Sequence, residues 1–226
     1  LGFIYAIAPL KIVYRMYRRR PEYKVSYDEF LKILEQVPEN DNMCIVRDGK
    51  MIFKSVLQDN LYERIEEYQG DREFYMPSPE EVLDYAKHGY PSEDPSYKKL
   101  ENFLREELHQ NTVQVIELMY IVFKEFSMDG MLSDIMEEFN NRNVVFDSEK
   151  QTEEFAAIMM NVNNNTRMLD FRGYTPNEIA RMSGPKASSA VMPSMVPMGS
   201  LASTPSFIPS NAATKKIYPN DPCPCG

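Results

Sequence analysis

A mainly helical protein is indicated first by residues 113–126, whose sequence is VQVIELMYIVFKEF. One apolar side repeats every three or four residues and consists of Val113, Ile116, Tyr120, Phe123 and Phe126. A second apolar side consists of Val115, Leu118 and Val122. A helix that is apolar on two sides is usually buried among other elements. We therefore expect this segment to form a central, buried helix.

Capping signals and apolar spacing predict further helices on both sides of this segment. Ser26 with Glu29, and Ser78 with Glu81, have the spacing of a capping box. Asp94 precedes Pro95, a residue suited to the first turn of a helix. The predicted helices cover residues 9–20, 26–36, 57–68, 78–87, 94–109, 132–139, 148–162 and 175–182.

One short β-hairpin interrupts the helices. Met43–Arg47 and Lys50–Lys54 are rich in β-forming residues, and Asp48-Gly49 joins them, which is the strongest short hairpin signal. The apolar segment Leu1–Leu10 has no basic residues before it and no cleavage site after it, so we interpret it as core and not as a signal peptide. The expected fold class is mainly α, with one small β-hairpin.

The chain divides into four expected parts. Residues 1–70 form a helix-helix-hairpin subdomain, and residues 71–182 form a helical domain. Residues 183–214 form a flexible linker, since five prolines lie among Ser, Ala, Gly and Met and only Lys186 is charged. Met192, Met195 and Met198 could instead form an adaptable docking strip. Residues 215–226 form a separate tail.

Length and composition narrow the class of protein. The chain has 226 residues, enough for one or two domains with a real core. No apolar run reaches the roughly 18–20 residues that cross a bilayer, so we expect no membrane contact. Three unevenly placed cysteines indicate a reducing compartment rather than a disulfide scaffold, and we expect a cytoplasmic protein.

Charge is unevenly distributed along the chain. The formal net charge is −9, although residues 1–25 hold six basic groups and one acid. The acidic remainder disfavours broad binding to nucleic acids, which depends on Lys and Arg. Arg18, Arg19 and Arg20 form a possible basic patch for RNA or an acidic partner. The alternative is a solvated helix C-terminus, where cations suit the helix dipole.

Catalytic machinery is hard to find in the sequence. The common phosphate-binding, zinc-protease and serine-hydrolase motifs are missing. His88 and His109 each lie near a predicted helix end, which is typical of surface histidines. Adjacent carboxylates such as Glu80-Glu81 point about 100° apart on a helix, so we expect solvated faces rather than a shared site. Cys44 lies in a hairpin strand and is expected to be a buried, inert thiol.

A second unusual segment is rich in asparagine. Asn163, Asn164, Asn165 and Arg167 could form a polar interaction patch. The structural alternative is a helix end followed by a reorienting loop, because Asn side chains favour both. In that alternative, Arg167 bonds main-chain carbonyls.

The tail carries the most specific motif of the chain. Residues 215–226 read KKIYPNDPCPCG, in which Cys223 and Cys225 are separated by one proline. This segment resembles the opening of the SEC-C motif, the zinc-binding C-terminal tail of the SecA preprotein translocase. In that family a second Cys-Cys or Cys-His pair follows about eight residues later. The resemblance implies that Cys223 and Cys225 are two of the four ligands of a Zn²⁺ ion.

Two thiolates cannot close a tetrahedral zinc shell. The other ligands are expected beyond residue 226 in a longer natural chain, or from a second tail across a dimer. The alternative is two unliganded thiols, and for residues 1–226 alone we expect no bound zinc. More loosely, the body resembles uncharacterised bacterial proteins that have a helical body and a SEC-C tail, which imply no known activity.

These features predict a non-enzymatic bacterial interaction or adaptor protein. Its body would recognise a protein partner, and its tail would bind zinc and dock a chaperone, a translocation component or a ribosome, as the resemblance implies. A nucleic-acid-binding regulator is the main alternative, because residues 9–54 have the helix-helix-wing order of a winged helix. The acidic residues Asp28 and Glu29 in its second helix argue against that alternative. An enzyme is a third and weaker hypothesis.

Overall fold

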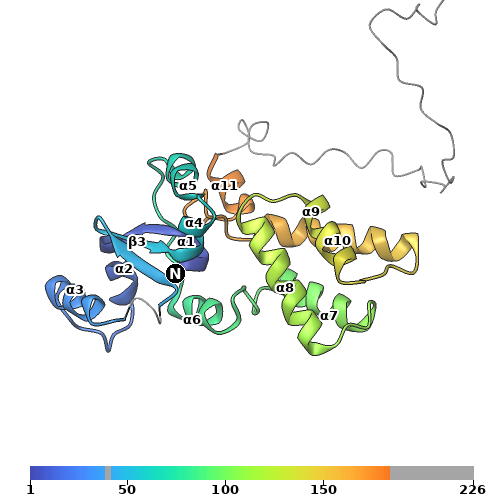
Figure 1. Cartoon of the computed structure of the whole chain (residues 1–226), viewed down its shortest axis with the longest axis horizontal. Helices are drawn as coiled ribbons and strands as arrows, with labels where there is room; N and C mark the ends of the chain where they lie inside the picture. The colour runs from blue at the N-terminus through green and yellow to red at the C-terminus, as the bar shows by residue number, and fades with distance from the viewer. Residues whose placement is uncertain (39–41, 184–226) are drawn as a thin grey trace, which may run out of the picture. The chain divides into compact units, whose positions relative to one another are not determined.

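The computed structural model describes residues 1–38 and 42–183, which belong to one compact unit. Eleven helices and three strands lie in these two ranges (Figure 1). The expected mainly helical class is therefore confirmed. The predicted linker over residues 183–214 begins one residue too early, because Ser183 belongs to the last helix; its other residues, its methionines and the cysteine tail lie outside the described residues.

A three-stranded antiparallel sheet occupies the N-terminal part of the unit. The elements in chain order are α1 (Gly2–Tyr5), β1 (Ile7–Pro9), α2 (Leu10–Tyr17), α3 (Tyr27–Glu35), β2 (Cys44–Arg47) and β3 (Lys50–Phe53). The predicted hairpin is confirmed, with Asp48 and Gly49 at φ values of 50° and 71°. Strand β3 lies in the centre, in the order β1-β3-β2.

The first ten residues are core, as the sequence predicts. Ile4, Tyr5, Ala6, Ile7 and Ala8 are all buried. Their division into a short helix and an edge strand was not predicted. Strand β1 has only three residues and ends at Pro9, so it shows no usable alternation of apolar and polar side chains. Proline is tolerated there because an edge strand needs fewer main-chain donors.

The single helix predicted over residues 57–68 is wrong. Two helices replace it, α4 (Lys54–Gln58) and α5 (Tyr62–Gln69). Between them, Asn60 takes a left-handed conformation with φ of 56°. Asparagine reaches this conformation more easily than most residues because its side chain can bond to the local main chain. The turn redirects the chain before α5 packs near β1.

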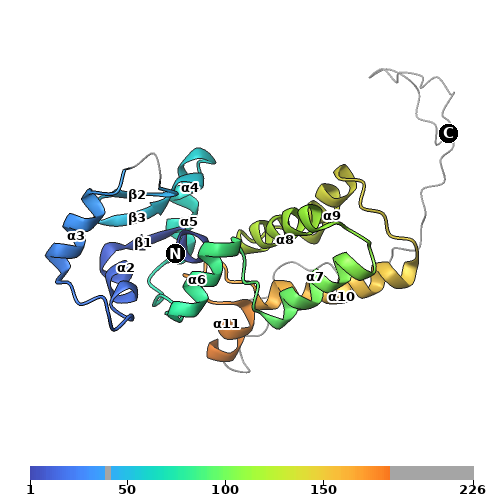
Figure 2. The same ribbon diagram turned by 90° about the horizontal axis from the view of Figure 1, so that it is seen from below.

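The remaining helices form the second part of the unit. They are α6 (Pro79–His88), α7 (Pro95–Glu106), α8 (Thr112–Ser127), α9 (Leu132–Asn141), α10 (Glu149–Asn165) and α11 (Pro176–Ser183). Helix α7 packs against both α8 and α10, while α9 packs against α8 (Figure 2). Every helix predicted after residue 78 is present in the structure.

Helix α8 is buried on one side and exposed on the other. Its second side is buried, as expected, together with Phe123 and Phe126. The other side is not buried in its first half. There, Val113, Ile116 and Tyr120 are 74%, 51% and 40% exposed. The expectation of burial on both sides is therefore wrong for this half. Among the described elements, α7 and α9 make the main contacts with α8, and these contacts leave the row exposed.

The two predicted subdomains share one hydrophobic core. Its buried side chains run from Ile4 to Val162, across the boundary expected at residue 70. Buried Gln69 strengthens the connection, because its side-chain amide donates to the carbonyls of Tyr5 at 2.7 Å and Leu169 at 3.0 Å. Within residues 1–38 and 42–183, no helix is long and apolar enough to cross a membrane.

Candidate functional site

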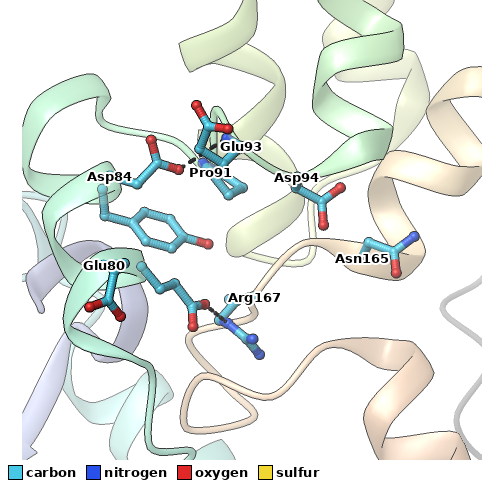
Figure 3. Close-up of a pocket in the computed structure, with 9 residues that line it drawn as sticks. Glu80, Asp84, Pro91, Glu93, Asp94, Asn165 and Arg167 are labelled. Carbon is cyan, nitrogen blue, oxygen red and sulfur yellow. Dashed lines mark hydrogen bonds and ion pairs between the residues drawn. The ribbon is translucent and has the colours of Figure 1, made fainter.

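A pocket of about 310 Å³ lies where three segments of the chain meet. Helix α6, the turn that follows it and the end of α10 all contribute to its wall. Figure 3 shows Glu80 and Asp84 on the α6 side of the pocket and Asp94 and Asn165 on the opposite side, with Arg167 between the two sides and the Glu80 carboxylate turned away from Arg167. Its nine lining residues are Glu80, Glu81, Asp84, Tyr85, Pro91, Glu93, Asp94, Asn165 and Arg167.

Helix α6 is positioned by its N-terminal cap. The hydroxyl of Ser78 accepts a hydrogen bond from the main-chain N–H of Glu81 at 3.1 Å, as predicted. The reciprocal half of the predicted capping box is missing. The Glu81 carboxylate instead accepts from the Tyr75 hydroxyl at 2.9 Å and from the Arg167 side chain. The carboxylate expected to cap the helix therefore joins it to the end of α10.

The turn after α6 is held by two aspartates. Asp84 accepts from the hydroxyl of Ser92 and from the main-chain N–H of Glu93. Asp94 caps α7 by accepting from the main-chain N–H of Ser96 at 2.8 Å. Gly89 ends α6 with φ of 79°, a left-handed value that glycine adopts without strain. These contacts fix two carboxylates at the rim of the pocket.

Arg167 is the most connected side chain of the pocket. Its guanidinium donates to Glu81, to Glu178 at 2.8 Å and to the Gly173 carbonyl at 3.0 Å. The guanidinium carbon also lies 3.4 Å from the centre of the Tyr75 ring. Burial opposes its charge, but the two carboxylates outweigh burial, so the pKa of Arg167 is raised.

Tyr85 lines the pocket with a hydroxyl that has no hydrogen-bond partner in the described part of the chain. The side chain is only 1% exposed, and its ring packs against Phe123 at 5.5 Å between centroids. Burial raises the pKa of Tyr85 well above its usual value, so the hydroxyl stays neutral. Leaving a buried hydroxyl without a partner costs about 1–3 kcal/mol.

The structure separates the members of the predicted asparagine patch. Asn165 donates to the carbonyl of Asn161 at 2.8 Å and accepts from Asn177 at 3.2 Å. Asn163 and Asn164 lie in the last turn of α10 and are half-buried. The Nε and Nη1 donors of Arg167 are engaged inside the protein. These positions correspond to the structural alternative, a helix end that leads into a reorienting loop.

The predicted basic patch is also engaged with its own protein. Arg19 donates to the carbonyls of Met76 and Pro77 at 2.8 and 2.6 Å. Arg18 contacts the Tyr14 hydroxyl at 3.2 Å, and Arg20 contacts the Tyr23 hydroxyl at 3.4 Å. All three arginines of the predicted patch therefore make contacts within the protein.

The remaining candidates lie apart from one another. His88 is exposed and 3.9 Å from Asp84, and His109 is exposed in the loop between α7 and α8. Cys44 is a free thiol and half-buried instead of fully buried, and burial raises its pKa. In the described ranges, no three acidic, His or Cys side chains are grouped as metal ligands. Cys223 and Cys225 lie outside those ranges.

The acidic pocket itself was missed in the sequence. Glu80 and Glu81 were expected on separate solvated faces, yet both line it. Glu80 and Asp84 are four residues apart, which places them on the same side of a helix and could have served as a signal. No spacing could reveal that Asn165 and Arg167 complete the wall.

Comparison of the chain with protein-family models, with curated proteins and with solved structures finds no match in any of the three. The SEC-C resemblance of the tail therefore remains a prediction from its residues.

Proposed function

We propose that this protein is a non-enzymatic interaction or adaptor protein whose body recognises a basic protein partner. The observation that carries this proposal is the acidic pocket. Five carboxylates and one guanidinium line it, and the guanidinium is paired internally. Such a surface attracts a positively charged protein and speeds its association.

A binding role is supported by what the lining carboxylates contact. Asp84 and Asp94 accept from main-chain and hydroxyl donors, and Glu81 is paired with Arg167. Fixed carboxylates of this kind provide a rigid electrostatic surface.

The tail is proposed to add a second contact in the longer natural protein. Cys223 and Cys225 would supply two thiolate ligands of a Zn²⁺ ion, and the folded zinc tail would dock a chaperone, translocation or ribosomal partner. Two linked contacts on one chain bind more tightly than either contact alone. Cytoplasmic localisation belongs to the same proposal.

The experiment is a pulldown from cytoplasmic extract with the full natural chain. We expect a basic partner whose capture weakens strongly when Cys223→Ser and Cys225→Ser are combined. We also expect about one zinc per chain by elemental analysis, lost in the same double variant. Capture that is unaffected by the double variant, together with a zinc-free wild-type protein, would refute the role of the tail.

The order of elements favours a nucleic-acid-binding regulator as a second candidate. Strand β1 pairs with strand β3 of the hairpin, and α2 and α3 lie between β1 and the hairpin in the chain. This order of elements resembles that of a small winged helix. Charge opposes this function, because Asp28, Glu29 and Glu35 are exposed on α3 and only Lys32 is basic among its exposed residues. Salt-dependent retention on heparin and a gel shift with DNA or RNA would support it over the adaptor function.

A further inference from the structure

The acidic pocket has an excess of negative charge that its own arginine does not balance. Its lining residues include five carboxylates and Arg167; Glu93 is paired with Lys98 at 2.5 Å and Glu81 with Arg167, which leaves Glu80, Asp84 and Asp94. Arg167 is already neutralised by Glu81 and by Glu178, at 2.8 Å. Glu80, which is exposed, has no ion pair within the described residues. A cation that enters here gains attraction without having to displace Arg167.

Tyr85 independently indicates a ligand with hydrogen-bond donors. Its hydroxyl is buried, neutral and without a partner in the part of the chain described. A neutral phenol can accept a hydrogen bond from an ammonium or a guanidinium N–H. The N–H of such a ligand would satisfy a group that the protein leaves unpaired.

The arrangement fits an organic cation better than a metal ion. The pocket carboxylates are divided between α6 and the turn that follows it, and no three acidic, His or Cys side chains in the described ranges are grouped as metal ligands. The volume of about 310 Å³ has room for an alkyl chain with a charged end. Pro91 and Tyr85 are the apolar and aromatic residues of the pocket lining against which the methylene groups would pack.

We propose that the pocket receives one Lys or Arg side chain of the basic protein partner, between Asp84 on one side and Asp94 on the other, with an N–H donated to the Tyr85 hydroxyl. This inference rests on the proposed function, because it assigns the partner's contact to one site. It also predicts that blocking the charge of that side chain abolishes binding at the pocket.

The test uses the whole chain and a defined probe, the tripeptide Gly-Lys-Gly blocked at both ends, followed by amide chemical shifts. We expect shifts confined to residues 80–94 and 165–167, and none with the N-acetyl-lysine form of the same peptide. Shifts with 1,5-diaminopentane but none with either peptide would overturn the assignment to a protein side chain. Equal shifts with charged and acetylated peptides would also overturn it.

Two variants make the test specific. Tyr85→Phe removes only the unpaired hydroxyl, so it should weaken peptide binding about tenfold while the protein becomes no less stable. Glu80→Gln should weaken binding about two- to fivefold, whereas Glu106→Gln, on the exposed surface of α7, should leave it unchanged. Weaker binding caused equally by all three variants would contradict a defined pocket.

Partner capture separates this inference from the proposed function. If the full chain captures a basic partner and the Tyr85→Phe, Glu80→Gln double variant captures it equally well, the pocket assignment fails while the adaptor function stands. If the tripeptide binds as expected but no partner is captured, the pocket chemistry stands and the adaptor function fails.

Discussion

Arg167 joins three segments that are far apart in the sequence. It pairs with Glu81 on α6 and with Glu178 on α11, and it bonds the Gly173 carbonyl in the loop between α10 and α11. Its side chain is only 12% exposed, so water screens these pairs weakly. The sequence singled out Arg167 but not its partners, because sequence spacing carries no information about contacts 86 residues apart.

Replacing Arg167 should destabilise the protein strongly. Arg167→Met keeps much of the side-chain length but leaves two carboxylates and one carbonyl without their donor, at a cost of about 2–3 kcal/mol. Arg105→Met is the matched control, since Arg105 pairs with Glu101 in a more exposed position within one helix, where the expected loss is below about 1 kcal/mol. Urea denaturation measures both, and equal losses would contradict the role of Arg167.

Asp170 should make stability depend on pH. Burial raises its pKa above the usual value of 3.8, and the nearby Asp129 adds to this, although Arg64 at 3.5 Å opposes it. The unfolded chain therefore loses this proton at a lower pH than the folded protein does. The contribution of Asp170 to stability is largest below pH 3.8 and falls as the pH rises through the folded-state pKa.

Asp170→Asn removes this titration. The free energy of unfolding of the wild type should fall more steeply than that of the variant as the pH rises above 3.8. Chemical denaturation across that range measures the two slopes. Asp129→Asn is the control for the neighbouring carboxylate, whose pKa burial also raises. Identical slopes for wild type and Asp170→Asn would show that Asp170 does not titrate differently in the folded protein.

Among the elements, α8 shows what periodicity can and cannot predict. Its length and helical character follow from residues 113–126, and so does the burial of one side. The exposure of Val113 and Ile116 depends on which helices pack beside α8, and periodicity does not specify neighbours. The break between α4 and α5 was missed for a similar reason, because one left-handed residue, Asn60, separates two compatible helical patterns.

The two sides of α8 should respond differently to the same substitution. Leu118→Ala removes a side chain that is 1% exposed and should cost about 2–5 kcal/mol. Ile116→Ala changes a side chain that is 51% exposed and should stay within about 0.5 kcal/mol of the wild type. Thermal or urea denaturation distinguishes the two outcomes. A large loss for Ile116→Ala would mean that this row is covered in solution.

In the described unit as a whole, the predicted boundary at residue 70 does not separate two hydrophobic cores. The hairpin and helices of residues 1–70 were expected to form a subdomain, yet the N-terminal segment packs directly against the loop before α11. A methyl group added at Gly173 would lie 2.8 Å from Ile4 and 3.0 Å from the Tyr5 ring. Pairing of this kind depends on tertiary structure, and local residue patterns do not reveal it.

Gly173→Ala should therefore cost more than backbone strain alone. Gly49 also has a positive φ, 71° against 86° for Gly173, but a methyl group there meets nothing within 4 Å. Gly49→Ala should cost about 1 kcal/mol, and Gly173→Ala should add a steric cost of about 1–3 kcal/mol. Denaturation midpoints of the two variants provide the comparison. Equal losses would argue against close packing between Gly173 and the N-terminal segment.

The hydrogen bonds of Gln69 determine how late in synthesis the N-terminal sheet can complete its packing. The Gln69 amide bonds the carbonyls of Tyr5 and Leu169, which are 64 and 100 residues away from it in opposite directions along the chain. Leu169 also completes the small buried cluster that contains Ile7, Ile52 and Ile65. The N-terminal sheet thus emerges early from the ribosome but lacks its last contacts until Leu169 has followed. Until then, part of its apolar surface stays exposed, and incomplete chains that stop short of Leu169 should be prone to aggregation.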